Sequence, residues 1–404
     1  MNHPNDSLSR RVPSARRSSA ALLGALCLAL PAHLQARSAA LSEPLVLPAP
    51  SQAPAVIGPG PVVVHSAFGG FILGYDIDQD GNTGLLCEAF TLENGQHDVA
   101  IETFDQRTGA IVKIVAQQLD SKSDFLALGV VGSHVGLVEF EHVSGLFVDK
   151  RQYFMLDPLA GGALTGRWTP PLATSDLILG VGRSQGFAET PVLAFHGAQF
   201  GTFLFGSDVK ADTFGPIIEL TDPDFDVNHV PVIALDAATH RAVLGTLGGN
   251  PFGPPKLATV DLSTGATEVF TGLGIGYVNG IAVDSSTGRA CTSTEIDFRL
   301  EFYDLATHAG TIVKLPGAQS QAHSAKDVQC DPVHGLFLAG QPITSTGPAG
   351  TGSIQVFDEH GNFVESLNGF HLPASPALMA LRPSRRTGFV VVAPDLSSLQ
   401  SFTY

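Results

Sequence analysis

The chain has 404 residues, of which 44% are hydrophobic and 15% are charged, with 44 glycines and a formal net charge of −16. This excess of acidic side chains repels nucleic acid and anionic lipid, so we expect neither as a partner. Few charges and many glycines favour strands and tight turns over amphipathic helices.

The first 40 residues have the three parts of a secretory signal. Four arginines precede an apolar run from Ala20 to Leu30, and small side chains at Ser38, Ala39 and Ala40 follow. The apolar run is too short to cross a bilayer, and no later run is long enough. We therefore expect a signal peptide over residues 1–40, a periplasmic or secreted protein, and a Pro-rich linker or tail over residues 41–61.

A phrase returns about every 50 residues from there on: a short apolar run that ends in Asp, a turn, and a second apolar run. Ile281 to Gly288 is one example, with Asp284 ending the first run. Repeats of this length built from short strands predict a radial β architecture. Seven copies can be placed by their first strands, at Gly70–Asp76, Phe125–Val131, Leu177–Gly182, Val230–Asp236, Gly280–Asp284, Asp327–Asp331 and Ala377–Pro383.

A second hairpin signature marks the later half of most copies. Phe104-Asp105 to Gly109 and Val260-Asp261 to Gly265 show it, with Asp opening the turn and Gly supplying its left-handed position. Two hairpins give four antiparallel strands, which form one blade. The last copy has three strands, so Val62–Val64 is expected to supply the fourth. The predicted fold is an all-β, seven-bladed β-propeller over residues 62–404, closed by an N-terminal strand that leaves no exposed edge.

This layout resembles the seven-bladed propellers of the YVTN and NHL type, with the gluconolactonase and senescence-marker-protein family as more distant relatives. The resemblance rests on Val278 to Gly288 and on the Asp…Thr-Gly hairpins. Gluconolactonases hold a metal with an acidic residue from the first blade and with Asn and Asp from later inner strands. Asn279 matches that Asn, but Gly70 and Phe71 stand near the first acidic position and Lys326 at the Asp position, so the resemblance does not imply the metal-dependent activity.

Candidate binding residues stand at the starts of the innermost strands and just after second strands. Because innermost strands begin on one face, these side chains are expected to surround the mouth of a central channel. Their oxygens suit a hard cation or a polar ligand, while the structural alternative is that they cap strands and solvate the channel. The predicted binding residues are Asp124, Asp176, Asn228, Asn279, Glu295, Lys326 and Gln341.

Asp76, Asp78 and Asp80 have the spacing of a calcium loop, with Gly81 at the sharp turn. Gly84 and Cys87 stand where further oxygen ligands would be expected, and Asp76 is already explained by the repeat. The alternatives are therefore a calcium site, calcium being the cofactor considered, and a solvated Asp-rich turn.

The remaining residues indicate no catalytic machinery. The sequence has no Gly-x-Ser-x-Gly elbow, phosphate loop or dinucleotide fingerprint. Cys87, Cys291 and Cys330 each lie in a strand-like run and are expected to be buried thiols, with a Cys291–Cys330 bridge as the alternative. The leading hypothesis is an exported, monomeric, non-catalytic propeller that binds a small molecule, glycan or protein on its long-loop face. The alternative is a lactonase-like hydrolase or lyase with a central divalent cation.

Overall fold

The computed structural model describes residues 57–404 with internal gaps, at 79–80, 93–96, 118–122, 132–133, 144–145, 158–162, 169–176, 183–191, 198–200, 209–212, 215–217, 221–231, 237, 246–252, 343–350, 374–378 and 393–395. Between residues 115 and 217 the backbone of the strands is described without their side chains. The chain divides into two units, Met1–Ala53 and Pro54–Tyr404. The expected signal peptide over residues 1–40 lies outside the described residues.

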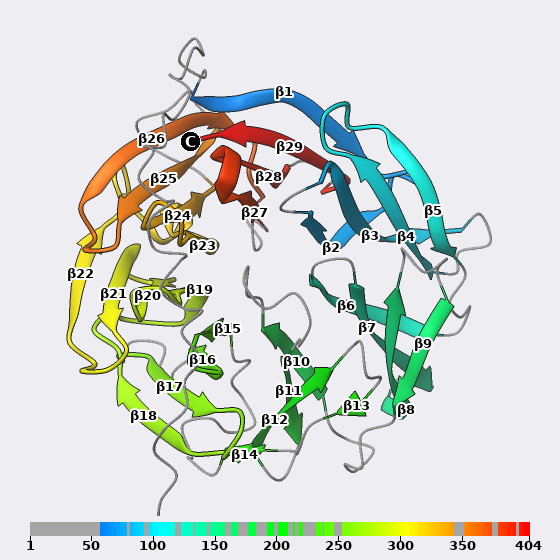
Figure 1. The fold of residues 1–404 in the computed structure, drawn as a ribbon, viewed down its shortest axis with the longest axis horizontal. Helices are drawn as coiled ribbons and strands as arrows, with labels where there is room; N and C mark the ends of the chain where they lie inside the picture. Colours follow the sequence, from blue (N-terminus) through cyan, green and yellow to red (C-terminus); the bar gives the residue numbers. More distant parts are fainter. Residues whose placement is uncertain are drawn as a thin grey trace, which may run out of the picture. The chain divides into compact units, whose positions relative to one another are not determined.

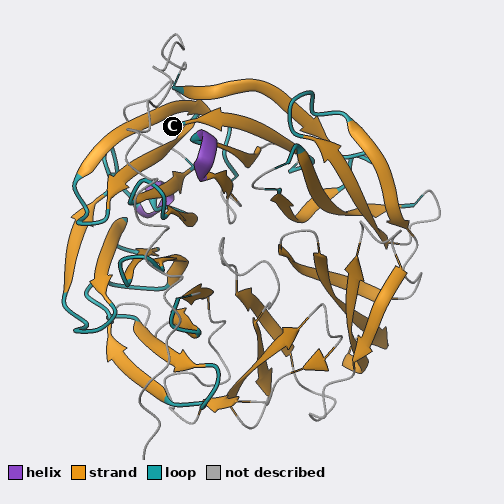
Figure 2. Cartoon of the chain, in the orientation of Figure 1, coloured by secondary structure: helices purple, strands orange, loops and turns teal. Residues whose placement is uncertain are grey.

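The described part of the second unit is built from antiparallel sheets, and it contains two short 3₁₀ turns, Gln321–His323 and Pro383–Arg385, and no α-helix (Figure 2). Each sheet is formed mainly by strands that follow one another in the chain.

The first three sheets in chain order contain β2 (Phe71–Ile77), β3 (Thr83–Thr91), β4 (His97–Asp105) and β5 (Ile111–Gln117); β6 (Ser123–Val131), β7 (His134–Val143), β8 (Leu146–Asp157) and β9 (Ala163–Trp168); and β10 (Leu177–Gly182), β11 (Val192–Gly197), β12 (Gly201–Asp208), β13 (Thr213–Phe214) and β14 (Ile218–Leu220).

The other sheets contain β15 (Val232–Asp236), β16 (Arg241–Gly245), β17 (Lys256–Asp261) and β18 (Thr267–Thr271); β19 (Val278–Asp284), β20 (Arg289–Thr294), β21 (Arg299–Asp304) and β22 (Gly310–Lys314); β23 (Asp327–Asp331), β24 (Leu336–Gln341), β25 (Gly352–Asp358) and β26 (Phe363–Phe370); and β27 (Met379–Arg382), β28 (Thr387–Val392) and β29 (Ser398–Thr403) with β1 (Gly58–His65).

The first strand of each sheet contacts the first strand of the next. β2 contacts β6, and the series continues through β10, β15, β19 and β23 to β27, which in turn contacts β2 (Figure 1). Sheets packed side by side through their innermost strands are the arrangement of a β-propeller. The predicted propeller fold is therefore confirmed.

β1 is hydrogen-bonded to β29, at the far end of the chain. Val63 lies opposite Gln400 and Val64 opposite Leu399. Val64 is completely buried in one core cluster with Leu399, Phe389 and Val391, whereas Val63 on the next position is exposed. The pairing matches the role expected of Val62–Val64, but β1 begins at Gly58, inside the stretch expected to be a linker.

The repeated Asp residues build the hairpin turns. Asp261 Oδ1 accepts hydrogen bonds from the amides of Ser263 and Thr264, both at 2.9 Å, and Gly265 takes a φ of +76°. The hydroxyl of Ser263 also donates to Oδ1 at 2.6 Å. This bond, together with those from the two amides, lowers the pKa of Asp261 to about 2, because each favours the charged carboxylate. The turn Asp residues therefore have the structural role that the repeat predicts.

The cysteines are confirmed as buried free thiols. Cys87, Cys291 and Cys330 are all buried and unbridged, and burial raises the pKa of each thiol. Cys291 and Cys330 lie in the same core cluster as Phe302 and Phe337.

Candidate functional site

A four-stranded antiparallel sheet places its loops at two opposite ends. The hairpins β2–β3 and β4–β5, and their counterparts in the other sheets, form the end that we call the turn face. The links between second and third strands, and those between successive sheets, form the other end, which we call the loop face. On the loop face, residues 66–70 join β1 to β2 and residues 272–277 join β18 to β19.

Two of the predicted binding residues form an ion pair on the loop face, and a third is bonded to the backbone beside them. Lys326 Nζ lies 3.4 Å from Glu295 Oε1, and both side chains are partly buried. Asn279 Nδ2 donates to the carbonyl oxygen of Ala325, the residue before Lys326, at 3.3 Å. The ammonium of Lys326 thus occupies the position next to Glu295 that a bound metal ion would need.

Gln341 differs from this group because its side chain is completely buried. Its Nε2 donates to the carbonyl oxygen of His323 at 2.9 Å, and its Oε1 accepts from Gln355 Nε2 at 3.0 Å. Gln341 therefore holds the link before β23 from below.

The remaining predicted residues cannot all be placed. Asp176, Asn228 and Asp80 lie outside the described residues, and Asp124 lies in β6, where the backbone alone is described. Asp76 Oδ1 accepts from the amide of Ile77 at 2.8 Å, and Asp78 is exposed beside the turn. The part of the chain that the structure describes holds no group of three His, Cys, Asp or Glu side chains that could bind a metal ion. The calcium loop and the full channel cluster stay predictions.

Sequence reasoning missed a pair of buried glutamates below residues 66–70. Glu88 on β3 and Glu102 on β4 are both 0% exposed. Glu102 accepts from the amide of Ala67 through both oxygens, at 3.2 and 3.1 Å. Glu88 accepts from the amides of Phe68 at 2.9 Å and Gly70 at 2.6 Å. Both glutamates accept amides of the same short link, so their carboxyl groups lie close together.

Burial and proximity change the titration of this pair. Removal from water raises the pKa of Glu102 to about 8, and the hydrogen bond and charge of Glu88 add to the shift. Two carboxylates so close cannot both ionise easily, so the pair retains one proton at neutral pH.

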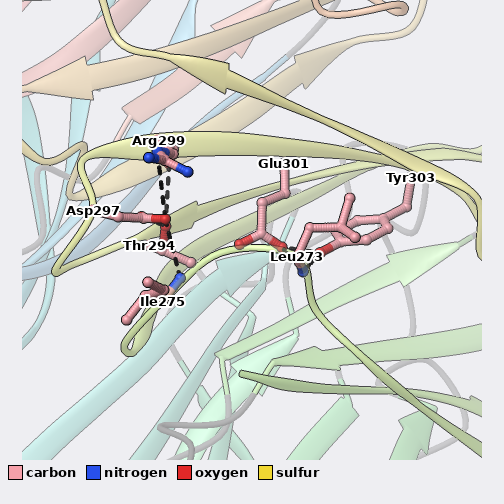
Figure 3. Close-up of polar contacts among 7 residues, drawn as sticks. All are labelled: Leu273, Ile275, Thr294, Asp297, Arg299, Glu301 and Tyr303. Carbon is pink, nitrogen blue, oxygen red and sulfur yellow. Dashed lines mark hydrogen bonds and ion pairs between the residues drawn. The ribbon is translucent and has the colours of Figure 1, made fainter. Parts of the chain in front are cut away.

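A related arrangement supports residues 272–277 (Figure 3). Glu301 Oε2 accepts from the amide of Leu273 at 3.1 Å and from the hydroxyl of Tyr303. Asp297 Oδ2 accepts from the amide of Ile275 at 3.1 Å, while its other oxygen accepts from Thr294. Glu301 is 0% exposed, and burial raises its pKa to about 7. A buried carboxyl group again satisfies the amides of a link on the loop face.

The sequence contains a signal for these glutamates. Glu102, Glu301 and Gln355 each stand three residues before the Asp that opens the second hairpin of their sheet, at Asp105, Asp304 and Asp358. A polar residue at a fixed position inside an otherwise apolar third strand indicates a repeated internal role rather than solvent exposure.

The supported links expose apolar side chains. Phe68, Phe71, Leu273 and Ile275 are between 39% and 47% exposed. Phe68 stacks on the buried ring of Phe90, with 4.4 Å between ring centroids. Phe68 and Leu273 are thus exposed apolar side chains whose backbone amides are hydrogen-bonded to buried glutamates.

Together the sheets and this face define a β-propeller with a built loop face. No protein-family model matches the chain, and no curated protein matches it. Among solved structures, the chain is similar to one titled "Crystal Structure of Mitotic Checkpoint Complex", with a TM-score of 0.59, 13% sequence identity, and coverage of 89% of this chain and 97% of that one. At this identity the likeness extends to the propeller fold. In the described residues, no helix is long and apolar enough to span a membrane.

Proposed function

We propose that the chain is a seven-bladed propeller, closed by β1, that acts as an exported, non-catalytic protein-binding module and docks its partner on the loop face. The seven sheets, the contact of β27 with β2 and the pairing of β1 with β29 support the closed form. The relation to YVTN and NHL propellers belongs to the same proposal.

The exposed apolar groups on supported links are the observation that carries the proposal. Aromatic and aliphatic anchors that are fixed before binding lose little conformational entropy when a partner covers them. Phe68 is stacked on Phe90, and its amide is bonded to Glu88, so both its ring and its backbone are positioned in advance.

A protein partner fits these groups better than a glycan or a small polar ligand. Phe71 and Phe68 offer apolar surface, and Lys326, also on the loop face, is already paired with Glu295. The solved structure similar to this chain is titled as a complex, which agrees with a propeller serving as an assembly module. We favour this reading over the metal-dependent hydrolase because Lys326 would compete with a cation for Glu295.

The test compares charge substitutions on the two faces. The purified chain, Phe71→Asp and Val333→Asp would each be immobilised and exposed to soluble extract and medium of the source cells. Val333 is the matched control because it is 66% exposed in the β23–β24 turn, on the turn face. Circular dichroism melting would establish that all three are folded.

We expect proteins retained by the parent chain to be retained equally by Val333→Asp and at least about tenfold less by Phe71→Asp, as for loss of an interface anchor. The proposal fails if Val333→Asp loses them while Phe71→Asp keeps them. It also fails if the parent retains nothing beyond a heat-unfolded control.

A further inference from the structure

Two buried carboxyl groups accept hydrogen bonds from the backbone of the link at residues 66–70. Glu102 and Glu88 together accept the amides of Ala67, Phe68 and Gly70. The link is also tied sideways, since the amide of Ser66 donates to the carbonyl oxygen of Ser397 at 3.0 Å. Within the described residues, the carboxyl pair therefore accepts the amides of Ala67, Phe68 and Gly70.

The fit at Gly70 shows how closely the pair approaches the backbone. A Cβ at this position would lie 2.7 Å from Glu88 Oε2 and closer still to the carbonyl oxygen of Ala89. Such contacts are too short for any side chain, so glycine lets the carboxyl group reach the amide. The link and the pair are built as one unit.

The charges around the pair are mostly acidic. Asp98 lies on β4, two alternate positions before Glu102, and is buried. Burial raises the pKa of Cys87 on β3, and the negative charges of Glu88 and Glu102 raise it further. His65, just before the link, is bonded to Ser398 through its ring. β6 contacts β3 and β4 and includes Asp124, whose side chain is outside the described part.

We propose that Glu88 and Glu102 form a one-proton latch that holds residues 66–70, and that loss of this proton to solvent releases the link that presents Phe68 and Phe71. In the one-proton state one of the two buried carboxyl groups is neutral, and both groups accept the amides of the link. In the two-anion state two neighbouring buried negative charges repel, and opening to solvent relieves that repulsion. The effect on partner binding rests on the proposed function, whereas the latch itself does not.

The sign of the effect follows from the raised pKa. A released Glu102 would titrate near its ordinary pKa of 4.5, while the latched Glu102 titrates at about 8. The latched state therefore holds a proton that the released state gives up, so release becomes easier as pH rises and levels off above pH 8.

The blade of β23–β26 shows the same network without a titratable group. Gln355 and Gln341 occupy the positions that correspond to Glu102 and Glu88, and Gln355 Nε2 donates to Gln341 Oε1 at 3.0 Å. Glutamine is thus compatible with this position of the fold, and it removes the exchangeable proton. Glu102→Gln is the direct test variant.

The experiment measures hydrogen exchange of the amides of Ala67, Phe68 and Gly70 in the full chain at pH 7 and pH 9, expressed as protection factors so that intrinsic exchange rates cancel. From the two pKa values we expect protection to fall about tenfold in the parent chain. Glu102→Gln should show no such fall, and Glu88→Gln provides the same test should Glu102→Gln not fold. Glu301→Gln is the matched control, with the same substitution at the same position of another blade, and should keep the tenfold fall.

An unchanged protection factor in the parent, or an equal fall in both latch variants, would overturn the latch. The capture assay repeated at pH 7 and pH 9 separates this result from the proposed function. A tenfold fall in protection with no captured protein at either pH would sustain the latch and remove its role in docking. Captured protein together with unchanged protection would do the reverse.

Discussion

Exposed and buried carboxyl groups of this protein both accept hydrogen bonds from backbone amides, but their pKa values shift in opposite directions. Asp261 in an exposed turn and Glu301 inside a sheet both accept backbone amides. At the exposed turn, hydrogen bonds from the hydroxyl of Ser263 and from the amides favour the charged carboxylate of Asp261, and its pKa falls to about 2. Burial outweighs the amides at Glu301, whose pKa rises to about 7. The turn residues therefore stabilise the charged form, and the internal residues the neutral form.

This difference predicts a loss of stability with rising pH. The folded pKa of Glu301 is above its unfolded value of 4.5, so its contribution is complete below pH 4.5 and is lost as pH rises to about 7. From the size of the shift, Glu301 should contribute a fall of about 3 kcal/mol in the free energy of unfolding across this window, measured by urea unfolding. Glu102 adds its own fall over the same pH range because its pKa is also raised, so Glu301→Gln should make the fall of the parent chain smaller by about 3 kcal/mol.

The turn carboxylates provide the internal comparison, because Asp105 and Asp261 titrate at about 2 in the folded chain, below this window. A Glu301→Gln profile that parallels the parent between pH 4.5 and 7 would show that Glu301 is ionised throughout.

At this scale the sequence predicted residues that follow the rules of exposed turns and apolar strands. The turn Asp residues and the buried thiols were expected on those grounds. Glu88, Glu102 and Glu301 were missed, because burying a carboxyl group is costly unless amides are positioned to meet it. The amide of Ala67 is 35 residues from Glu102 in the sequence, and that of Leu273 is 28 residues from Glu301. These hydrogen bonds therefore depend on the tertiary fold.

At the level of elements, first strands were predictable and β1 was not fully so. Asp327–Asp331 matches β23 to the residue because a turn Asp marks the end of the apolar run, and the apolar run Leu177–Gly182 matches β10. β1 starts at Gly58, through Pro59 and Pro61, where a linker was expected. Proline lacks an amide donor and is tolerated in an outer strand that has a partner on one side, so the Pro-rich composition was misleading there.

The pairing of β1 with β29 predicts that substitutions at neighbouring positions of β1 have very different effects on stability. Val64 is 0% exposed and packs with Leu399, whereas Val63 is 39% exposed. Val64→Asp should lower the free energy of unfolding by about 3 kcal/mol or more, because it buries an unpaired charge. Val63→Asp should change it by less than about 1 kcal/mol. Equal effects in thermal and urea melts would contradict the pairing of β1 with β29.

For the whole molecule, the repeat determines the scaffold and leaves the function to the links. Propellers serve many activities, so the fold does not imply one of them. Within the predicted polar cluster, Lys326 is paired with Glu295, and Asn279 donates to the carbonyl oxygen of Ala325. The apolar groups of the loop face were not predicted, because exposure of Phe68 and Leu273 depends on the buried glutamates that hold their backbone.

Site-specific photo-cross-linking shows directly whether a protein partner docks on the loop face. A benzoyl-phenylalanine would replace Phe71 in one sample and Val333, on the turn face, in another, and each would be irradiated in extract of the source cells. Docking on the loop face predicts discrete higher-mass products from position 71 and none from position 333. Products from position 333, with position 71 unreacted, would place the partner on the turn face and contradict docking on the loop face.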